Sequence, residues 1–213
     1  MRKTMILVGA GPGLGNAIAR EFAKHDFIVV LMSRSQERLN NYAREFIAAG
    51  HEVYTKTVDA LHPGTLTQAF SEIMHQLGLP DAVVYNVGYT VRDHGRPISS
   101  DDLLQRYQVD VASAWHCAGL VALPEFGKKK GAILFTGGRL AKIIRPASHY
   151  IGKAALGAMT AVLRQALTPM GIFVGSVRLS QAPTPGDERF DPALIAQEFW
   201  KLYSERKEAD IFY

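Results

Sequence analysis

The sequence has very little cysteine, with Cys117 the only one among 213 residues. A single thiol cannot form an internal disulfide, which agrees with a reducing compartment. Cys117 lies in an apolar segment with helical spacing and has no second cysteine to pair with. We therefore expect a packed, inert thiol.

Long apolar runs are also absent. The longest, such as DFIVVLMS, are far shorter than the roughly 20 residues that a membrane-spanning helix needs. The N-terminal stretch MRKTMILVGAGPG is apolar for only a few residues and then enters a glycine loop, without the small-residue cleavage site of a signal peptide. We interpret it as a first strand and expect a cytoplasmic protein with no membrane association.

No charge of one sign dominates. The formal net charge is +4, and the densest basic cluster is GKKKG at 127–131, a pattern typical of a solvated turn. There is no basic stripe interleaved with aromatic residues, and no zinc-finger or helix-turn-helix signature. We therefore expect no nucleic-acid partner and no bound metal, although a mildly positive field would suit a phosphorylated cofactor.

What the sequence does contain is a regular alternation of short β-branched runs and amphipathic helical segments. The expected strands cover residues 5–10, 27–33, 52–59, 82–88, 131–137, 171–179 and 209–213. This alternation predicts an α/β fold, a Rossmann-type doubly wound parallel sheet of about seven strands with helices on both faces. We expect one domain over residues 1–213, with its ligand site at the carboxyl ends of the strands.

One of the expected helices is long. It runs through residues 103–123, with Asp101 and Asp102 as candidate caps and Pro124 near its end.

A glycine loop, VGAGPGLG, follows the first strand directly and opens the first helix. Gly9, Gly11, Gly13 and Gly15 allow a tight turn and a close approach of the backbone to a ligand, and the helix that begins near Leu14 offers free N–H groups to a pyrophosphate. A turn without a ligand would need fewer glycines. The spacing is G-x-x-x-G-x-G rather than the common G-x-G-x-x-G.

With this spacing, the sequence resembles the short-chain dehydrogenase/reductase family, and the resemblance extends over nearly the whole chain. VVLMSRSQERL is similar to the family's second strand and following turn, and LTPMGIFVGSV to the stretch before its sixth strand. YNVG stands where the family usually has N-N-A-G. The resemblance implies that Asp59 lies on the adenine side of a dinucleotide site, and that Asn86, Val87 and Gly88 also line that site.

The end of the second strand bears on the choice of cofactor. An NAD site usually has an acidic residue there, but this sequence has Ser33 and Arg34. A hydroxyl and a guanidinium suit a 2′-phosphate, whereas a carboxylate would repel it. We therefore favour NADP(H) over NAD(H); the alternative is a solvated arginine.

The resemblance also implies a Ser-Tyr-Lys catalytic set, often with a helical asparagine, and here the pattern breaks. Lys153 aligns with the family lysine, but His149 stands in the tyrosine position and Tyr150 comes one residue later. Asp110 occupies the asparagine position. Where the serine belongs there are two glycines, with Thr136 as the nearest hydroxyl.

The loop after the sixth strand departs from the family pattern as well. It reads LSQAPT and keeps only Thr184 as a candidate contact for the nicotinamide amide.

Helix geometry leaves both rings as candidates for proton transfer. At about 100° per residue, His149 lies about 40° from Lys153 around the helix, and Tyr150 about 60° away on the other side. A histidine beside an ammonium stays neutral at physiological pH and is a better base than acid. The alternative is that both rings only line the pocket, and that Asp110 is a buried carboxylate bonded to backbone amides.

Together these features predict an NADP(H)-dependent oxidoreductase that acts on a small carbonyl or alcohol substrate with an altered catalytic set. The alternative is a catalytically inactive NADP(H)-binding sensor or interaction protein on the same fold, since function depends on the site and not on the fold. The resemblance further implies a homodimer or homotetramer.

Overall fold

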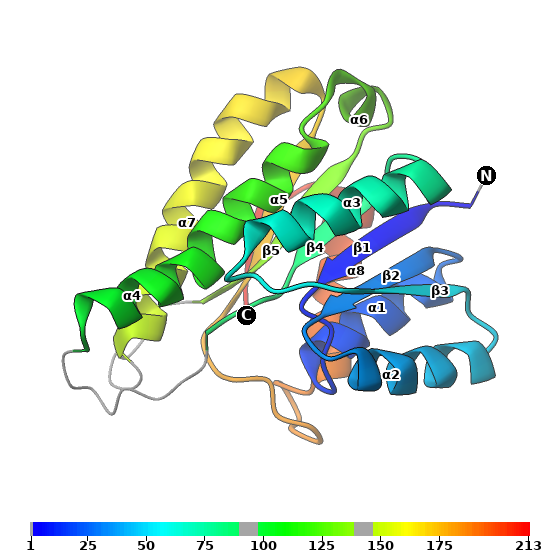
Figure 1. Cartoon of the computed structure of the whole chain (residues 1–213), viewed down its shortest axis with the longest axis horizontal. Helices are drawn as coiled ribbons and strands as arrows, with labels where there is room; N and C mark the ends of the chain where they lie inside the picture. Colours follow the sequence, from blue (N-terminus) through cyan, green and yellow to red (C-terminus); the bar gives the residue numbers. More distant parts are fainter. Residues whose placement is uncertain (1, 90–97, 139–146) are drawn as a thin grey trace.

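The computed structural model describes residues 2–89, 98–138 and 147–213. A seven-stranded sheet in the order β3-β2-β1-β4-β5-β6-β7 forms its centre, and every neighbouring pair is parallel (Figure 1). The predicted doubly wound α/β fold is therefore confirmed. The strands are β1 (Thr4–Val8), β2 (Ile28–Ser33), β3 (Val53–Thr57), β4 (Ala82–Tyr85), β5 (Ala132–Gly138), β6 (Phe173–Leu179) and β7 (Asp210–Phe212).

Helices cover both faces of the sheet. One face carries α1 (Leu14–Lys24), α2 (Gln36–Ala48) and α8 (Pro192–Glu205). The other carries α3 (Pro63–Leu77), α5 (Ser113–Val121), α7 (Ala147–Leu167) and the short α6 (Pro124–Lys128), with α4 (Ser100–Tyr107) leading into α5. A 3₁₀ turn, Thr168–Met170, follows α7. Within the described residues, none of these helices is long and apolar enough to cross a membrane.

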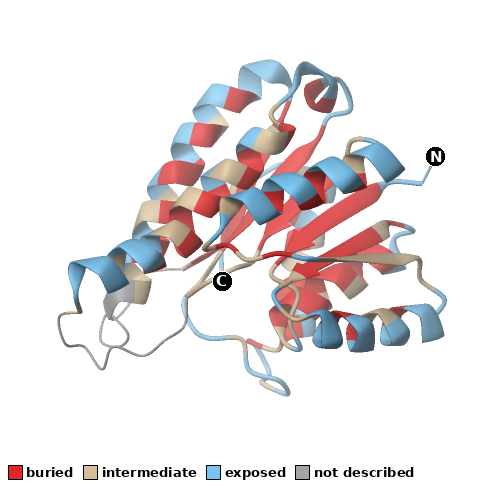
Figure 2. Ribbon diagram, viewed as in Figure 1, coloured by how far each residue is buried: buried red, intermediate tan, exposed pale blue. Residues whose placement is uncertain are grey.

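The central strands β1 and β4 are buried along their whole length because helices cover both of their faces. Every residue of β1 is buried, and Figure 2 shows the same for most of the central sheet. Met5 and Leu7 belong to the core under α1 and α8, whereas Ile6 and Val8 belong to the core under α3, α5 and α7. Alternate side chains of one strand thus fill two separate cores.

Cys117 is buried in the core under α5, and burial raises the pKa of its thiol. This agrees with the expected packed and unreactive cysteine.

The predicted helix cap at Asp101 and Asp102 is wrong, because the cap lies earlier in the chain. Ser99 caps α4, and its hydroxyl oxygen accepts a hydrogen bond from the N–H of Asp102 at 3.1 Å. Both aspartates lie in the first turn, where their negative charge faces the positive end of the helix dipole. A serine accepts this bond as well as an aspartate does, so residue type alone does not locate the cap.

The predicted long helix is also divided. α4 ends at Tyr107, a π-helical turn covers Gln108–Ala112, and α5 continues to Val121. The wider turn contains Asp110, which is fully buried, and it packs against α7. Interruptions of this kind are frequent at functional sites.

The strand order places a switch point between β1 and β4. The chain proceeds outward from β1 to β2 and β3, then returns to β4 on the other side of β1. In sheets of this type, ligands bind beside the carboxyl ends of the strands at this point.

Candidate functional site

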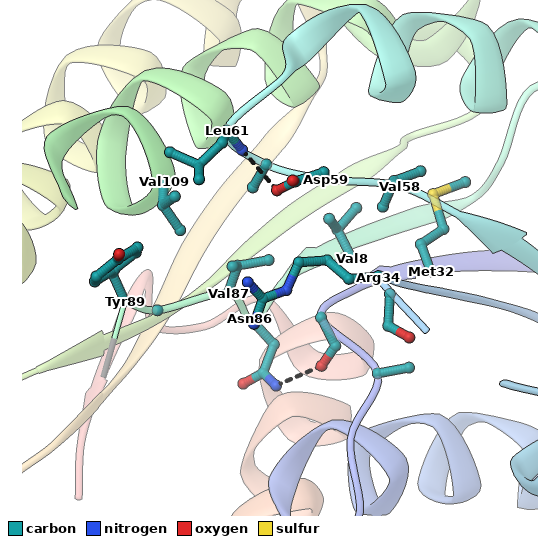
Figure 3. A pocket seen from close by; sticks show the side chains of 15 residues that line it. Val8, Met32, Arg34, Val58, Asp59, Leu61, Asn86, Val87, Tyr89 and Val109 are labelled. Atoms are coloured by element: carbon teal, nitrogen blue, oxygen red, sulfur yellow. Dashed lines mark hydrogen bonds between the residues drawn. The ribbon is translucent and has the colours of Figure 1, made fainter. Parts of the chain in front are cut away.

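A pocket of about 310 Å³ opens at the carboxyl ends of β1, β2 and β4, where the switch point lies (Figure 3). Its walls come from the first glycine turn, the end of β2, the turn after β3 and the segment after β4. The lining residues are Val8, Gly9, Ala10, Met32, Ser33, Arg34, Val58, Asp59, Ala60, Leu61, Asn86, Val87, Gly88, Tyr89 and Val109. The fold thus brings together the seven predicted cofactor residues Gly9, Ser33, Arg34, Asp59, Asn86, Val87 and Gly88.

Two glycines of the loop are required by the fold itself. Gly9 has a φ of +101°, and a Cβ there would lie 2.8 Å from the carbonyl carbon of Asn86. A Cβ on Gly15, inside α1, would lie 2.4 Å from the carbonyl oxygen of Gly9. The start of α1 therefore packs directly against the backbone at the ends of β1 and β4. A side chain on Gly9 or Gly15 would prevent this packing.

The other two glycines face open space. A Cβ on Gly11 or Gly13 would meet no heavy atom within 4 Å. Gly13 is also the N-cap of α1 and makes no side-chain cap bond, and α1 begins at the buried Leu14. The unpaired N–H groups of a helix N-terminus attract an anion. The open space in front of these two glycines therefore fits a pyrophosphate group.

Asn86 connects β4 to this loop. Its Nδ2 donates to the carbonyl of Gly9 at 3.0 Å, and its Oδ1 accepts from the hydroxyl of Thr136 at 2.7 Å. The backbone carbonyl of Thr136 in turn accepts from Nζ of Lys153 at 2.9 Å. The asparagine thus holds the loop by its side chain, and the predicted hydroxyl of Thr136 is engaged with that asparagine.

The end of β2 forms the outer part of the pocket. Arg34 is exposed and points into the pocket beside Ser33 (Figure 3). Asp59 lies across from them, but its own turn holds its carboxylate. Oδ1 accepts from the N–H of Leu61 at 3.0 Å, and Oδ2 lies 3.2 Å from Nδ1 of His62. This part of the site can therefore present a positive charge to a ligand.

The reaction-centre candidates meet at Gly88. A Cβ on Gly88 would lie 3.5 Å from Cε1 of His149, 3.6 Å from Nζ of Lys153 and 3.8 Å from Oδ1 of Asp110. The histidine ring is therefore on the same side of α7 as the lysine. Tyr150 is half-buried, with its ring centre 6.3 Å from that of His149.

Asp110 is fully buried. Its Oδ1 accepts from the backbone N–H of Tyr89 at 2.7 Å, and a Cβ on Gly152 would lie 2.4 Å from its Oδ2. Burial raises the pKa of this carboxyl, and the positive charge of Lys153 opposes the rise. Burial likewise lowers the pKa of the Lys153 ammonium, and Asp110 opposes that change. The two groups stabilise each other's charged form in a region that favours neutral ones.

The His149 ring has a low basicity. Burial, and then the positive charges of Lys153 and Arg106, lower its pKa from 6.5 to about 4. The ring is therefore neutral at pH 7. Its buried Nδ1 has no hydrogen-bond partner within the described part of the chain.

No side chain replaces the family serine at the end of β5. A Cβ on Gly138 would lie 3.1 Å from Cβ and Cγ of Lys153, and one on Gly137 would lie 2.9 Å from Cγ of Arg178. The lysine stem thus fills the space that a side chain at position 138 would occupy.

Thr184 stands apart from these groups. It is exposed on the segment between β6 and α8. Its N–H donates to the carbonyl of Phe190 at 2.8 Å, and its hydroxyl donates to the carbonyl of Ala182 at 3.1 Å. Both bonds are local, and among the described residues none connects Thr184 to Lys153 or to the pocket lining.

Sequence reasoning missed three residues of the reaction centre. Tyr89 lines the pocket and holds Asp110, Gly152 leaves room for the same carboxylate, and Arg106 is buried with its guanidinium carbon 5.5 Å from the ring centre of Tyr89. The spacing of Arg106 four residues before Asp110 could have indicated a shared helix face. The other two have no sequence signal beyond their neighbours. In the part of the chain that the structure describes, no group of three or more His, Cys, Asp or Glu side chains could hold a metal ion.

Comparison with known proteins agrees with this geometry. The profile of the family described as short chain dehydrogenase matches residues 3–192. An uncharacterized oxidoreductase of Mycobacterium tuberculosis, MT0954, is 30% identical over 193 residues, covering 84% of this chain and 73% of its own length. The oxidoreductase UcpA of Escherichia coli is 24% identical over 218 residues, covering 98% of this chain and 82% of that protein.

Solved structures share the fold at lower identity. L-sorbose reductase from Gluconobacter frateurii, in complex with NADPH and L-sorbose, has a TM-score of 0.88 at 22% identity, covering 100% of this chain and 95% of that one. An alcohol dehydrogenase from the archaeon Thermococcus sibiricus, in complex with 5-hydroxy-NADP, has a TM-score of 0.86 at 20% identity, with coverages of 99% and 94%. The family resemblance seen in the sequence is thereby confirmed. By its profile match and its 30% identical relative, the chain belongs to the short-chain dehydrogenase/reductase family of oxidoreductases.

Proposed function

We propose that this protein is an NADP(H)-dependent oxidoreductase that interconverts a small alcohol and its carbonyl compound. One observation carries the proposal: Gly88 lies in the wall of the pocket and is also the point where Lys153, His149 and Asp110 meet. A dinucleotide in the pocket would therefore extend toward titratable groups. When bound, its nicotinamide would supply or accept the hydride.

The pyrophosphate would be held by the open backbone around Gly11 and Gly13 at the start of α1. Ser33 and Arg34 favour a 2′-phosphate at the outer end of the pocket, because a guanidinium binds phosphate through two parallel hydrogen bonds. The named complexes of L-sorbose reductase with NADPH and of the archaeal alcohol dehydrogenase with 5-hydroxy-NADP support the same choice.

The roles at the reaction centre follow from charge and burial. Lys153 provides a buried positive charge and hydrogen-bond donors for ribose hydroxyls. His149, neutral at pH 7, would accept the proton of an alcohol as a weak base, and the protonated ring that a carbonyl oxygen would need is scarce at this pH. Tyr150 is the second candidate for proton transfer.

The proposal also includes a homodimer or homotetramer. Several large apolar side chains are exposed on the helices that cover one face of the sheet: Leu104 and Tyr107 of α4, Trp115 of α5, and Ile151 and Val162 of α7. Light scattering is expected to give a multiple of the 23.4 kDa chain mass. A clean monomer at micromolar concentration would contradict this part.

The test is a binding and turnover assay on the purified protein. Fluorescence titration should show NADPH binding, and a panel of alcohols with NADP⁺ should show turnover. His149→Ala should lower the turnover rate by about 100-fold or more, as expected for loss of a general base. Tyr150→Phe tests the second candidate in the same assay, and the variant with the larger loss of rate identifies the proton-transfer group. Equal rates in both variants and the wild type would exclude both rings from proton transfer.

A second candidate function is NADP(H) binding without redox chemistry. The observation that favours it is the lack of a side-chain hydroxyl at Gly138, together with the engagement of the Thr136 hydroxyl by Asn86. NADPH binding with no turnover on a broad panel of alcohols and carbonyl compounds would support this candidate, and robust turnover would eliminate it.

A further inference from the structure

Thr136, at the end of β5, lies at the centre of a chain of hydrogen bonds between the two halves of the site. Its backbone carbonyl accepts from Nζ of Lys153 at 2.9 Å. Its hydroxyl donates to Oδ1 of Asn86 at 2.7 Å, and Nδ2 of Asn86 donates to the carbonyl of Gly9 at 3.0 Å. One residue thus contacts the reaction-centre lysine directly and the glycine loop through a single amide.

Water has little access to two of the three side chains, those of Thr136 and Lys153. Thr136 is 8% exposed and Lys153 is 7% exposed. The asparagine also lies in tight packing: a Cβ on Gly9 would lie 2.8 Å from its carbonyl carbon, and a Cβ on Gly15 would lie 3.1 Å from its Nδ2. Its amide group therefore has little freedom to find other partners.

The Gly9 carbonyl fixes which way this amide faces, and the hydroxyl of Thr136 holds the amide in place. Nitrogen and oxygen of an asparagine side chain have nearly the same shape and differ only in their hydrogen bonds. A carbonyl only accepts, so the NH₂ group faces Gly9 and the oxygen faces the hydroxyl of Thr136, which donates to it. Without that donor, the amide oxygen loses its partner, and the bond from the amide to the Gly9 carbonyl is held less firmly.

The geometry points to Thr136 as a positioning residue that couples the glycine loop to Lys153, and not as the hydroxyl that contacts the substrate. The inference rests on the proposed function only in naming a dinucleotide as the ligand. The hydrogen bonds of Thr136, Asn86 and Lys153 are all within the protein. It predicts that a change at the reaction-centre end of the site alters dinucleotide binding at the other end.

The first experiment measures NADPH affinity by fluorescence titration without substrate. Thr136→Val keeps the shape of the side chain and removes the donor, and affinity should fall about tenfold, the order expected for one partly buried hydrogen bond. Thr136→Ser restores the donor and should bind within about twofold of the wild type. Thr160→Val is the matched control: Thr160 is 1% exposed, and its hydroxyl donates to the Leu156 carbonyl within α7. It should bind NADPH as the wild type does.

The second experiment measures amide hydrogen exchange in the protein without dinucleotide. The N–H groups of Gly9, Ala10 and Asn86 bond to carbonyls of the neighbouring strands β1 and β2. In Thr136→Val these amides should exchange faster, beyond any change in global stability measured on the same sample. In Thr160→Val they should not.

Two outcomes overturn the inference. One is unchanged NADPH affinity in a folded Thr136→Val variant, which would leave the proposed function intact. The other is failure of Thr136→Ser to restore affinity, which would show that shape and not the donor matters. If the wild type bound no dinucleotide while exchange at Gly9 and Asn86 still responded to Thr136→Val, the coupling would stand and the proposed function would fail.

Discussion

The two halves of the site follow the family pattern to different degrees. In the dinucleotide half, at the ends of β1 and β4, Gly9 and Gly15 are held by packing against backbone, while Gly11 and Gly13 face open space. In the reaction-centre half, at β5 and α7, Lys153 is the only member of the expected set that remains in its place. The glycine loop depends on close backbone packing, which a side chain at Gly9 or Gly15 would prevent. Proton transfer depends on side chains, and one side chain can be replaced by another.

In the reaction centre, the residues that replace the family pattern pack against one another and pair their charges. Asp110 is buried against Gly152, which has no side chain to displace it, and Lys153 provides its counter-charge. The stem of Lys153 packs against Gly138. These residues thus pack against one another as one group. Four measurements compare this group with the dinucleotide half.

The largest effect is expected from Lys153→Met. This change removes the buried ammonium and leaves the Asp110 carboxylate fully buried without the positive charge of Lys153, so the free energy of unfolding at pH 7 should fall by about 4 kcal/mol. Urea denaturation measures it. The double variant Asp110→Asn/Lys153→Met should recover at least half of the loss. A single variant as stable as the wild type would mean that Asp110 is already protonated in the folded protein.

Next in size is a contrast within the glycine loop. Gly15→Ala places a Cβ 2.4 Å from the Gly9 carbonyl oxygen and should lower the free energy of unfolding by about 3 kcal/mol. The Cβ of Gly13→Ala meets no heavy atom within 4 Å, so this change should cost less stability than Gly15→Ala. It should still weaken NADPH binding, because its methyl group enters the space of the pyrophosphate. Equal binding in Gly13→Ala and wild type would place the ligand elsewhere.

A smaller effect concerns pH and His149. Its pKa is about 4 in the folded protein against 6.5 for an ordinary histidine, so the unfolded chain takes up the proton first as pH falls. The ring therefore contributes stability above pH 6.5 that is lost as pH falls toward 4. The stability difference between wild type and His149→Gln should shrink by about 2 kcal/mol over this range, allowing for partial exposure of the ring. The raised pKa of Asp110 changes stability in the opposite direction over this pH range. Both proteins contain Asp110, so its contribution cancels in the difference. A constant difference from pH 7 to pH 4 would contradict a buried neutral ring.

The smallest expected effect tests the choice of cofactor. Arg34→Ala should weaken NADPH binding about tenfold by loss of a phosphate contact and leave NADH binding within about twofold. Arg38→Ala is the control, since Arg38 is exposed on the first turn of α2 and does not line the pocket. Titration of all three proteins with both dinucleotides measures the effect. An equal loss for NADPH and NADH would remove the basis for the NADP(H) preference.

The dinucleotide half could be predicted from the sequence because its signals are local. The loop from Gly9 to Gly15 follows a strand and opens a helix within a few residues, and Arg34 follows the next strand directly. The residues contact one another because carboxyl ends of parallel strands share one edge of the sheet. The reaction centre offered no such signal: Tyr89, Arg106 and Gly152 are far apart in sequence, and each acts through Asp110 or beside it.

By itself, the sequence determined the strand–helix alternation, the parallel sheet and the glycine loop, because these depend on spacings within short segments. It also placed His149 and Tyr150 on opposite sides of Lys153 around one helix, about 40° and 60° away from it, and left both as candidates. Only the tertiary structure decided that His149 lies beside the lysine and loses its basicity. The reason is physical: a pKa depends on burial and on nearby charges, here Lys153 of the same helix and Arg106, which α4 brings to the site.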